Sequence, residues 1–586
     1  MDSSSPEEQP LTKLSLITNT INQILQHKFS PKQRSSEQPT PEQPSPEQST
    51  PEKSTPEQST PKQRSSENMK LSLDQLPVDI LDIIIEMLNS PKLRTPLASV
   101  NKKLHALLQP IIFKTILMLW GTKESPRQIS HLLRSLQENP QLRELVKIIR
   151  IVPCSPFFES SPNDKIPVKN MGPAIDTMFD NIGGAKDIMV DALGSLEKDT
   201  GAVRALAKKG DTRAIVPLLA TTLPHLERLL LTGHIAAQQN LLGSFILACV
   251  NHATESGDMD KLNVPLASLK HVELMLDYHW GYNYKITGVA ATYLAFFYLP
   301  RLETMTVHAV YKGPQKWPSE QPPVATCLRY LEVETYHNEG RYIVNMMIRV
   351  CPALKTIKWT HLWGENDHKG FSLTAISSVL QAAAGQLDGV ILCLARSSGK
   401  MGSMFGPFLV DIERPETFVT GRLILAPLVH ATRLTLTWVH LFGLAASEDV
   451  QPGPSTFPPN LEVLSIRASR LITQEHLFWQ MFSKVRVARE FVGKCRLYAP
   501  RLRVCEFGLG VFVKHPLEDL IKRDLIHAGE TQGVKVTFHP ECFASPTLFP
   551  PARGDDSVLP NDWKWLVRDD DKEEKDDEEV EVDEVD

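Results

Sequence analysis

The chain lacks the short motifs that mark most catalytic and metal-binding proteins. Its eight cysteines form no C-x-x-C pair and have no histidine at zinc-like spacing, which argues against a zinc site and favours reduced thiols. It contains no G-x-x-x-x-G-K-[ST] phosphate loop, no G-x-S-x-G elbow, no H-E-x-x-H pair and no dinucleotide G-x-G-x-x-G. We therefore expect no catalytic residue, no cofactor and no metal ion.

Features of exported and membrane proteins are also missing from the sequence. No apolar run reaches the length of a membrane span, no basic-then-apolar segment marks a secretory signal, and no N-x-S/T glycosylation acceptor occurs. The sequence is typical of a cytoplasmic or nuclear protein, for which we expect neither a membrane nor a nucleic-acid partner.

The two ends of the chain differ in composition from the rest. Residues 29–67 are dominated by Pro, Ser, Thr, Glu and Gln, a composition that cannot offset the entropy of ordering. Residues 1–70 are therefore predicted to be disordered, and their Ser/Thr-Pro sites are either kinase targets or part of an unregulated spacer. Asp569–Asp586 holds thirteen acidic and two basic residues, so residues 561–586 are predicted to be a disordered acidic tail. Such a tail is either solvated or folded over a basic patch.

Residues 71–118 have more apolar surface than so short a segment can bury. Apolar residues at Ile80, Ile84 and Leu88 form a helical stripe that follows Leu76 and Pro77. A second run places Leu97, Val100, Leu104, Leu107 and Leu108 on one face, and Pro110 is predicted to end it. A unit of about forty residues has little interior. The surplus therefore indicates either a docking face for another protein or a helical hairpin that caps the next domain.

This segment resembles an F-box, the module by which substrate receptors attach to the Skp-type adaptor of SCF ubiquitin ligases. The resemblance rests on the Leu76-Pro77 opening, Asp79 two positions on, Ile80-Leu81, and Lys102 followed by Leu104. It implies adaptor contact through Leu76, Pro77, Ile80, Ile84, Leu88, Val100 and Leu104. Through the adaptor it implies cullin and ring-finger subunits as further partners. Pro96 stands where the second helix of the family runs, so this helix is expected to be frayed or absent.

In residues 119–560 an apolar-x-x-apolar-x-apolar pattern recurs, and each copy follows a segment with helical periodicity. Its copies begin at Leu226, Leu269, Leu302, Leu328, Leu354, Leu387, Ala431, Leu461 and Leu502, with degenerate copies at Val146 and around Val536. The shortest intervals match those of leucine-rich repeats. A proline often precedes a copy, as at Pro224, Pro300, Pro352, Pro459 and Pro500, and would end the helix before the strand. One strand and one helix cannot bury their apolar faces alone, so consecutive units are predicted to stack.

These observations predict an α/β fold: a short helical F-box followed by an irregular leucine-rich-repeat-like solenoid, with disordered termini. The resemblance, to fungal F-box proteins of this layout, implies a substrate-recognition subunit of an SCF-type ubiquitin ligase, which is not itself an enzyme. An F-box scaffold that works outside any ligase is one alternative. A repeat protein that binds no adaptor, or a hydrolase or nucleotide-binding protein with an unrecognised site, is another.

Substrate is expected on the strand residues that point away from the core. These alternate with the apolar positions and include Glu273, Tyr330, Glu332, Glu334, Lys358, Arg433 and Arg467. The glutamates fall in earlier repeats and the basic residues in later ones, which predicts an acidic half and a basic half. Histidines at such positions, including His271, His308 and His539, are expected to be surface residues rather than general bases.

Overall fold

The computed structural model divides the chain into two units, Met1–Lys70 and Leu71–Asp586, and every residue that it describes lies in the second unit. The described residues are 81, 85, 97–98, 100, 102–120, 125–153, 204–205, 208, 212–232, 235–236, 240–256, 266–275, 293–309, 316–336, 340–363, 371–396, 419–443, 452–467, 474–508 and 518–539. The expectations for the disordered region 1–70 and the acidic tail 561–586 lie outside these residues.

A twelve-stranded parallel sheet dominates the second unit. Each of its strands pairs with the next one along the chain, as expected for stacked units. The strands are β1 (Thr115–Trp120), β2 (Ile148–Pro153), β3 (Arg228–Thr232), β4 (His271–Met275), β5 (Thr304–Ala309), β6 (Tyr330–Tyr336), β7 (Thr356–Trp363), β9 (Gly389–Arg396), β11 (Arg433–Thr437), β12 (Val463–Arg467), β13 (Val504–Gly508) and β14 (Lys535–His539). Two short strands, β8 (Phe371–Ser372) and β10 (Val419–Thr420), pair separately.

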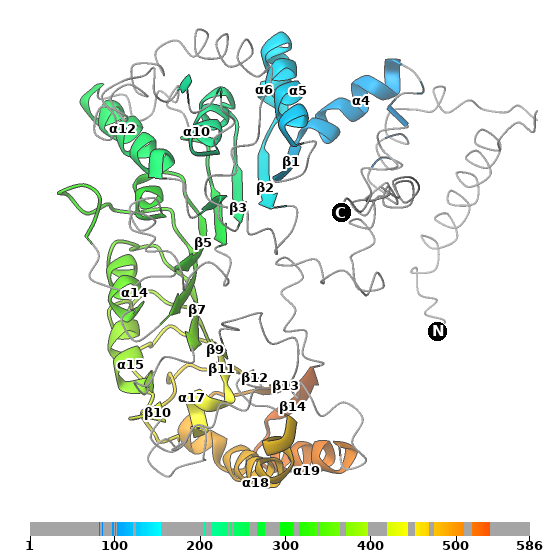
Figure 1. Cartoon of the computed structure of the whole chain (residues 1–586). Coiled ribbons are helices and arrows are strands. Elements are labelled where there is room, and N and C mark those ends of the chain that lie inside the picture. The colour runs from blue at the N-terminus through cyan, green and yellow to red at the C-terminus, as the bar shows by residue number, and fades with distance from the viewer. Residues whose placement is uncertain are drawn as a thin grey trace, which may run out of the picture. The chain divides into compact units, whose positions relative to one another are not determined.

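Helices connect these strands. They are α4 (Lys102–Phe113), α5 (Ser125–Glu138), α6 (Pro140–Leu145), α10 (Thr212–Thr222), α12 (Asn240–Ser256), the 3₁₀ helix η2 (Phe296–Tyr298), α14 (Gly340–Arg349), α15 (Leu373–Gln381), α17 (Trp438–Phe442), α18 (Gln474–Tyr498) and α19 (Glu518–Thr531). Figure 1 shows α12, α14 and α15 along one side of the sheet. In the described part of the chain, no helix combines the length and the apolar character needed to cross a bilayer.

The start of each strand follows the sequence pattern. Pro224, Pro300, Pro352, Pro459 and Pro500 all lie in turns, and the first apolar residue of the pattern comes two residues before each strand. Leu226, Leu354 and Leu502 are fully buried at this position. The predicted strands at all nine copies, and at the degenerate copies of β2 and β14, are confirmed. Before β5, residues Tyr293 to Tyr298 are helical and Tyr293–Phe297 are buried.

The core lies on one side of the sheet because side chains alternate along each strand. In β3, Leu229 and Leu231 belong to the main apolar core, whereas Leu230 between them does not. The same alternation places Val272 and Leu274 of β4 in the core. We call the opposite side, which carries Leu230 and its neighbours on adjacent strands, the outward face.

A row of mostly charged residues runs across the amino-terminal edge of the sheet, each of them one residue before a strand. Backbone hydrogen bonds join successive members, which are Lys147, Glu227, Lys270, Glu303, Arg329, Lys355, Asp388, Thr432, Glu462 and Arg503. Their charges alternate in sign over the first five positions. The Nζ of Lys147 lies 2.7 Å from Oε1 of Glu227, and the hydrogen bond from this ammonium lowers the pKa of Glu227.

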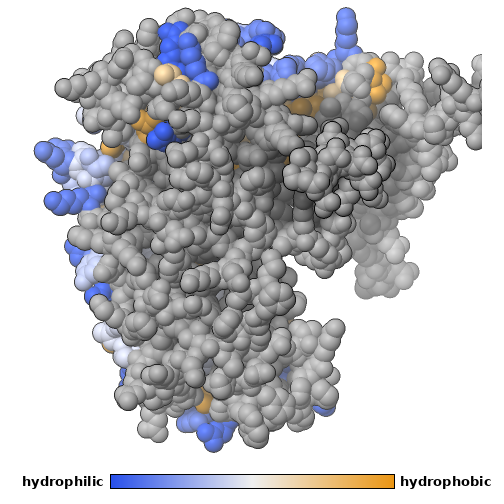
Figure 2. Space-filling view, viewed as in Figure 1, coloured by the Kyte–Doolittle hydropathy of each residue, from blue (hydrophilic) through white to orange (hydrophobic). Residues whose placement is uncertain are grey.

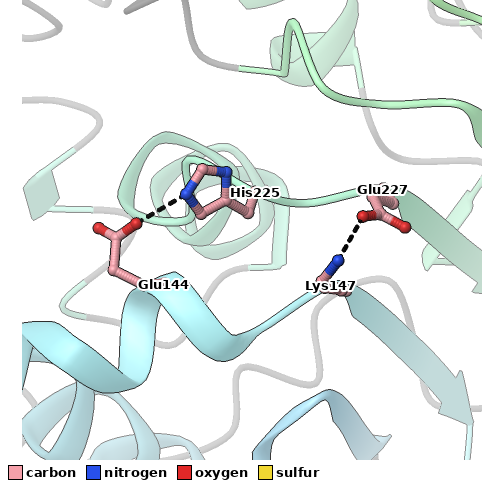
Figure 3. A network of polar contacts seen from close by, with 4 residues as sticks. All are labelled: Glu144, Lys147, His225 and Glu227. Atoms are coloured by element: carbon pink, nitrogen blue, oxygen red, sulfur yellow. Dashed lines mark hydrogen bonds and ion pairs between the residues drawn. The ribbon is translucent and has the colours of Figure 1, made fainter. Parts of the chain in front are cut away.

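A second polar contact lies beside this edge. Figure 3 shows His225, in the turn before β3, against Glu144 of α6, with the Lys147–Glu227 pair next to it. The His225 Nε2 to Glu144 Oε2 distance is 2.8 Å. Both contacts connect the unit of β2 to that of β3.

Candidate functional site

The outward face carries all seven of the residues expected to bind substrate, at positions fixed by the strand register. Counting from the first apolar residue of each copy, the second, fourth and sixth residues that follow point outward. The fourth position gives Glu273, Thr306, Glu332 and Lys358 on neighbouring strands β4 to β7. Glu332 of β6 is therefore directly opposite Lys358 of β7.

These two residues form an ion pair. The Nζ of Lys358 lies 2.6 Å from Oε1 of Glu332, and both side chains are at most one-third exposed. The hydroxyl of Tyr330 donates to Oε2 of the same glutamate over 3.1 Å. Burial, followed by the charge of Glu332, raises the pKa of Tyr330, so the phenol stays protonated and remains a donor.

Glu334 and His308 form a second pair on the outward face. His308 Nδ1 lies 2.8 Å from Glu334 Oε2, with the histidine side chain 5% exposed and the glutamate 8% exposed. Burial alone would lower the pKa of His308, but the carboxylate of Glu334 outweighs it, and the net shift is upward. The expectation that His308 is a surface residue is corrected: the register places it beside a carboxylate on β6, and both are buried together.

The other expected substrate residues have different surroundings. Glu273 is half-buried, Arg433 is exposed, and Arg467 donates from Nε to Ser465 Oγ over 3.1 Å. The expected acidic and basic halves are also corrected. Glu332 and Lys358, one from each half, neutralise each other, and Glu334 is paired with His308. The strand register places Glu332 opposite Lys358 and Glu334 opposite His308. The prediction of two halves counted residues along the sequence and did not consider these neighbours on adjacent strands.

Cys393 of β9 lies near the same cluster. Burial is the main cause that raises the pKa of its thiol, and the nearby charge of Lys358 only partly offsets it. A protonated thiol is a poor nucleophile. Among the described residues, no group of three or more His, Cys, Asp or Glu side chains is arranged to hold a metal ion. The outward face thus carries two fixed charge pairs, Glu332 with Lys358 and Glu334 with His308.

The segment expected to bind the adaptor is described only in part. Leu76, Pro77, Ile80, Ile84 and Leu88 lie outside the described residues. Leu81 and Ile85 are helical and buried, and Ile85 packs with Ala98 and Leu108 in a small apolar cluster separate from the main core.

Two further features of this segment bear on the expected contacts. Val100 is 46% exposed, whereas Leu104 of α4 is fully buried within the chain. Pro110 does not end the second run, as had been predicted, because α4 continues through it to Phe113. The helix tolerates the proline because the apolar residues after it, including Ile111 and Ile112, pack against the small cluster. Figure 2 shows apolar colour on the surface where α4 lies.

Neither a scan against protein-family models nor a search of curated proteins finds a match to this chain.

Proposed function

We propose that the chain is a substrate-recognition subunit of an SCF-type ubiquitin ligase. Residues 71–118 act as the F-box that binds the Skp-type adaptor, and through it the cullin and ring-finger subunits. Residues 119–560 act as a leucine-rich-repeat-like region whose outward face binds a substrate protein. The chain supplies proximity and no catalytic group, since holding a substrate near a charged conjugating enzyme raises its effective concentration.

One observation carries this proposal. An apolar helix, α4, leads through the single residue Lys114 into β1, the first strand of a sheet whose strands follow chain order. Leu107, Ile111 and Ile112 of that helix stay only partly buried. An apolar helical module joined directly to an array of strand–helix units is the layout that the F-box resemblance implies.

The test is co-purification of a Skp-type adaptor with the full chain. Replacing both Leu76 and Pro77 by alanine removes an aliphatic anchor worth ~1.5–3 kcal/mol and the start of a helix, so adaptor binding should fall by at least about tenfold. His105→Ala is the matched control, because His105 is an exposed residue of α4 outside the expected contact set.

The alternatives give different results in the same experiment. Adaptor that co-purifies equally with the double variant and the wild type contradicts the F-box assignment. Adaptor retained without cullin and ring-finger subunits favours a scaffold acting outside a ligase. A chain that recovers no adaptor at all is a repeat-domain interaction protein.

A further inference from the structure

One arginine on the outward face has a buried guanidinium nitrogen with no hydrogen-bond partner among the described residues. Arg150, in the middle of β2, is half-buried, and its Nε is buried without a hydrogen-bond partner in the part of the chain that the structure describes. By contrast, Lys358 and His308 each contact a carboxylate, and Arg467 donates to a hydroxyl.

Aliphatic side chains surround Arg150 on the sheet. The register places Leu117 of β1 and Leu230 of β3 directly opposite it on the two sides, at a strand spacing of roughly 4.8 Å. Ile148 and Val152 precede and follow it on the same face of β2. Leu230 is buried although it is not part of the main core. The position of Arg150 in the sheet is therefore flanked by apolar residues on four sides.

A second cation, Arg228, lies diagonally from Arg150. Arg228 begins β3 opposite Ile148, two residues before the register position of Arg150. It is directly opposite His271 of β4, and no ion pair joins Arg228 to a described residue. Burial and then the charge of Arg228 lower the pKa of His271, which keeps that imidazole neutral.

Apolar surroundings determine what such a site binds best. A charge pair is stronger where water is partly excluded, and an arginine can hold a carboxylate through two parallel hydrogen bonds. The aliphatic frame favours aliphatic neighbours on either side of the anion.

We infer that Arg150 and its frame of Leu117, Ile148, Val152 and Leu230 form a binding site for an acidic side chain flanked by aliphatic residues on a partner protein. Arg228 is placed to meet a second acidic residue of the same segment. This inference deepens the proposed function, because the partner is then the substrate.

The experiment uses the purified full chain and three short peptides, observed by saturation-transfer NMR, which detects weak ligands. The probes are acetyl-Ser-Leu-Asp-Leu-Ser-amide and its analogues with Asn or phosphoserine in place of Asp. We expect the Asp peptide to bind the wild type about tenfold or more tightly than the Asn peptide, as for a lost charged hydrogen bond. Arg150→Leu should abolish that difference.

A thermal measurement separates binding from structural support. Because the buried Nε of Arg150 has no hydrogen-bond partner among the described residues, and its neighbours in the sheet are aliphatic, Arg150→Leu should leave the Tm unchanged or raise it. The matched control is Arg301→Leu, at an exposed arginine in the turn before β5, which should change neither peptide binding nor Tm.

Several outcomes would overturn the inference. Equal binding of the Asp and Asn peptides contradicts it, as does full binding by the Arg150→Leu variant. A loss of both binding and Tm in that variant makes Arg150 a structural residue. If only the phosphoserine peptide binds, the group that the site recognises is a phosphate and not a carboxylate. None of these measurements involves the adaptor, so a failure of the F-box assignment would be recognised separately by the Leu76 and Pro77 variant.

Discussion

Lys358 and Glu332 lie opposite each other on β7 and β6, with their charged atoms 2.6 Å apart. This pairing changes how the outward face can be tested. Reversing the charge of Glu332 would not only remove an acidic side chain from the outward face, but would also place a second positive charge beside Lys358. Loss of substrate capture in such a variant could therefore come from damage to the sheet.

The energetic value of this pair can be measured with a double-mutant cycle. Glu332→Gln and Lys358→Met should each lower the free energy of unfolding by ~1–3 kcal/mol. Each change leaves the remaining charged partner partly desolvated and without a counter-charge. The double variant should lose less than the sum, with a coupling of about 1 kcal/mol or more. Urea unfolding of the four proteins gives the coupling.

The matched control is the Lys355–Asp388 pair, which is 3.5 Å apart with both side chains about half exposed. Its coupling should be close to zero, because water screens exposed pairs. Additive effects for Glu332 and Lys358 would show that their ion pair does not contribute to stability.

Two buried histidines should affect stability in opposite directions as pH changes. Burial, followed by the charge of His361, lowers the pKa of His440 to about 3. The unfolded chain takes up this proton below the ordinary value of 6.5 but the folded chain does not, so the contribution of His440 is lost as pH falls from 6.5 toward 3. The limiting slope is about 1.4 kcal/mol per pH unit.

His308 has the opposite sign. Its pKa is raised in the folded state, so its contribution is fully present below 6.5 and is lost as pH rises through the folded pKa. His440→Asn should flatten the acid side of a Tm-against-pH curve, and His308→Gln should flatten the neutral-to-alkaline side. The asparagine can keep a hydrogen bond to Thr437 Oγ1, which lies 2.7 Å from His440 Nδ1. Parallel shifts of the whole curve in both variants would contradict the prediction.

The positions of the strands could be predicted because each copy of the pattern has a fixed phase. Once Leu302 and Leu328 are recognised as equivalent, His308 and Glu334 follow at the same offset of six residues, and their strands are adjacent. The same counting places Arg150 beside Leu230. The pairing of opposite residues was thus present in the sequence, but it appears only when the copies are aligned with one another.

Burial on the outward face could not be predicted in this way. Alternation along a strand gives the side to which a residue points, whereas exposure depends on everything that packs above it. His308 and Arg433 both point outward, yet one is buried and the other is exposed. Pro110 shows a related limit, because packing of the apolar residues that follow it outweighs the local tendency of proline to end a helix.

In the charged row at the amino-terminal edge, exchanging the two charges of a pair should preserve stability, whereas placing two like charges side by side should lower it. Lys147→Glu alone places two carboxylates on adjacent strands and should lower the Tm slightly, in line with ~0.2–1 kcal/mol for exposed cross-strand pairs. The double variant Lys147→Glu with Glu227→Lys restores an opposite pair and should recover most of that loss. Differential scanning calorimetry measures the shifts, and a double variant less stable than Lys147→Glu would rule out a pairwise role.

Arg433 offers the cleanest remaining test of substrate binding on the outward face. It is exposed on β11 between Gly389 and Val463, which carry no charge, and no ion pair with a described residue involves it. Exposed arginines of this kind often dominate the energy of an interface. Arg433→Glu should therefore reduce substrate capture by about tenfold or more, while adaptor binding and Tm stay unchanged.

Capture is measured by quantitative mass spectrometry of proteins retained by the tagged chain. Arg501→Glu, at an exposed arginine in the turn before β13, is the matched control. Unchanged capture by Arg433→Glu would move the substrate site off this part of the face, to inserted segments such as 156–210.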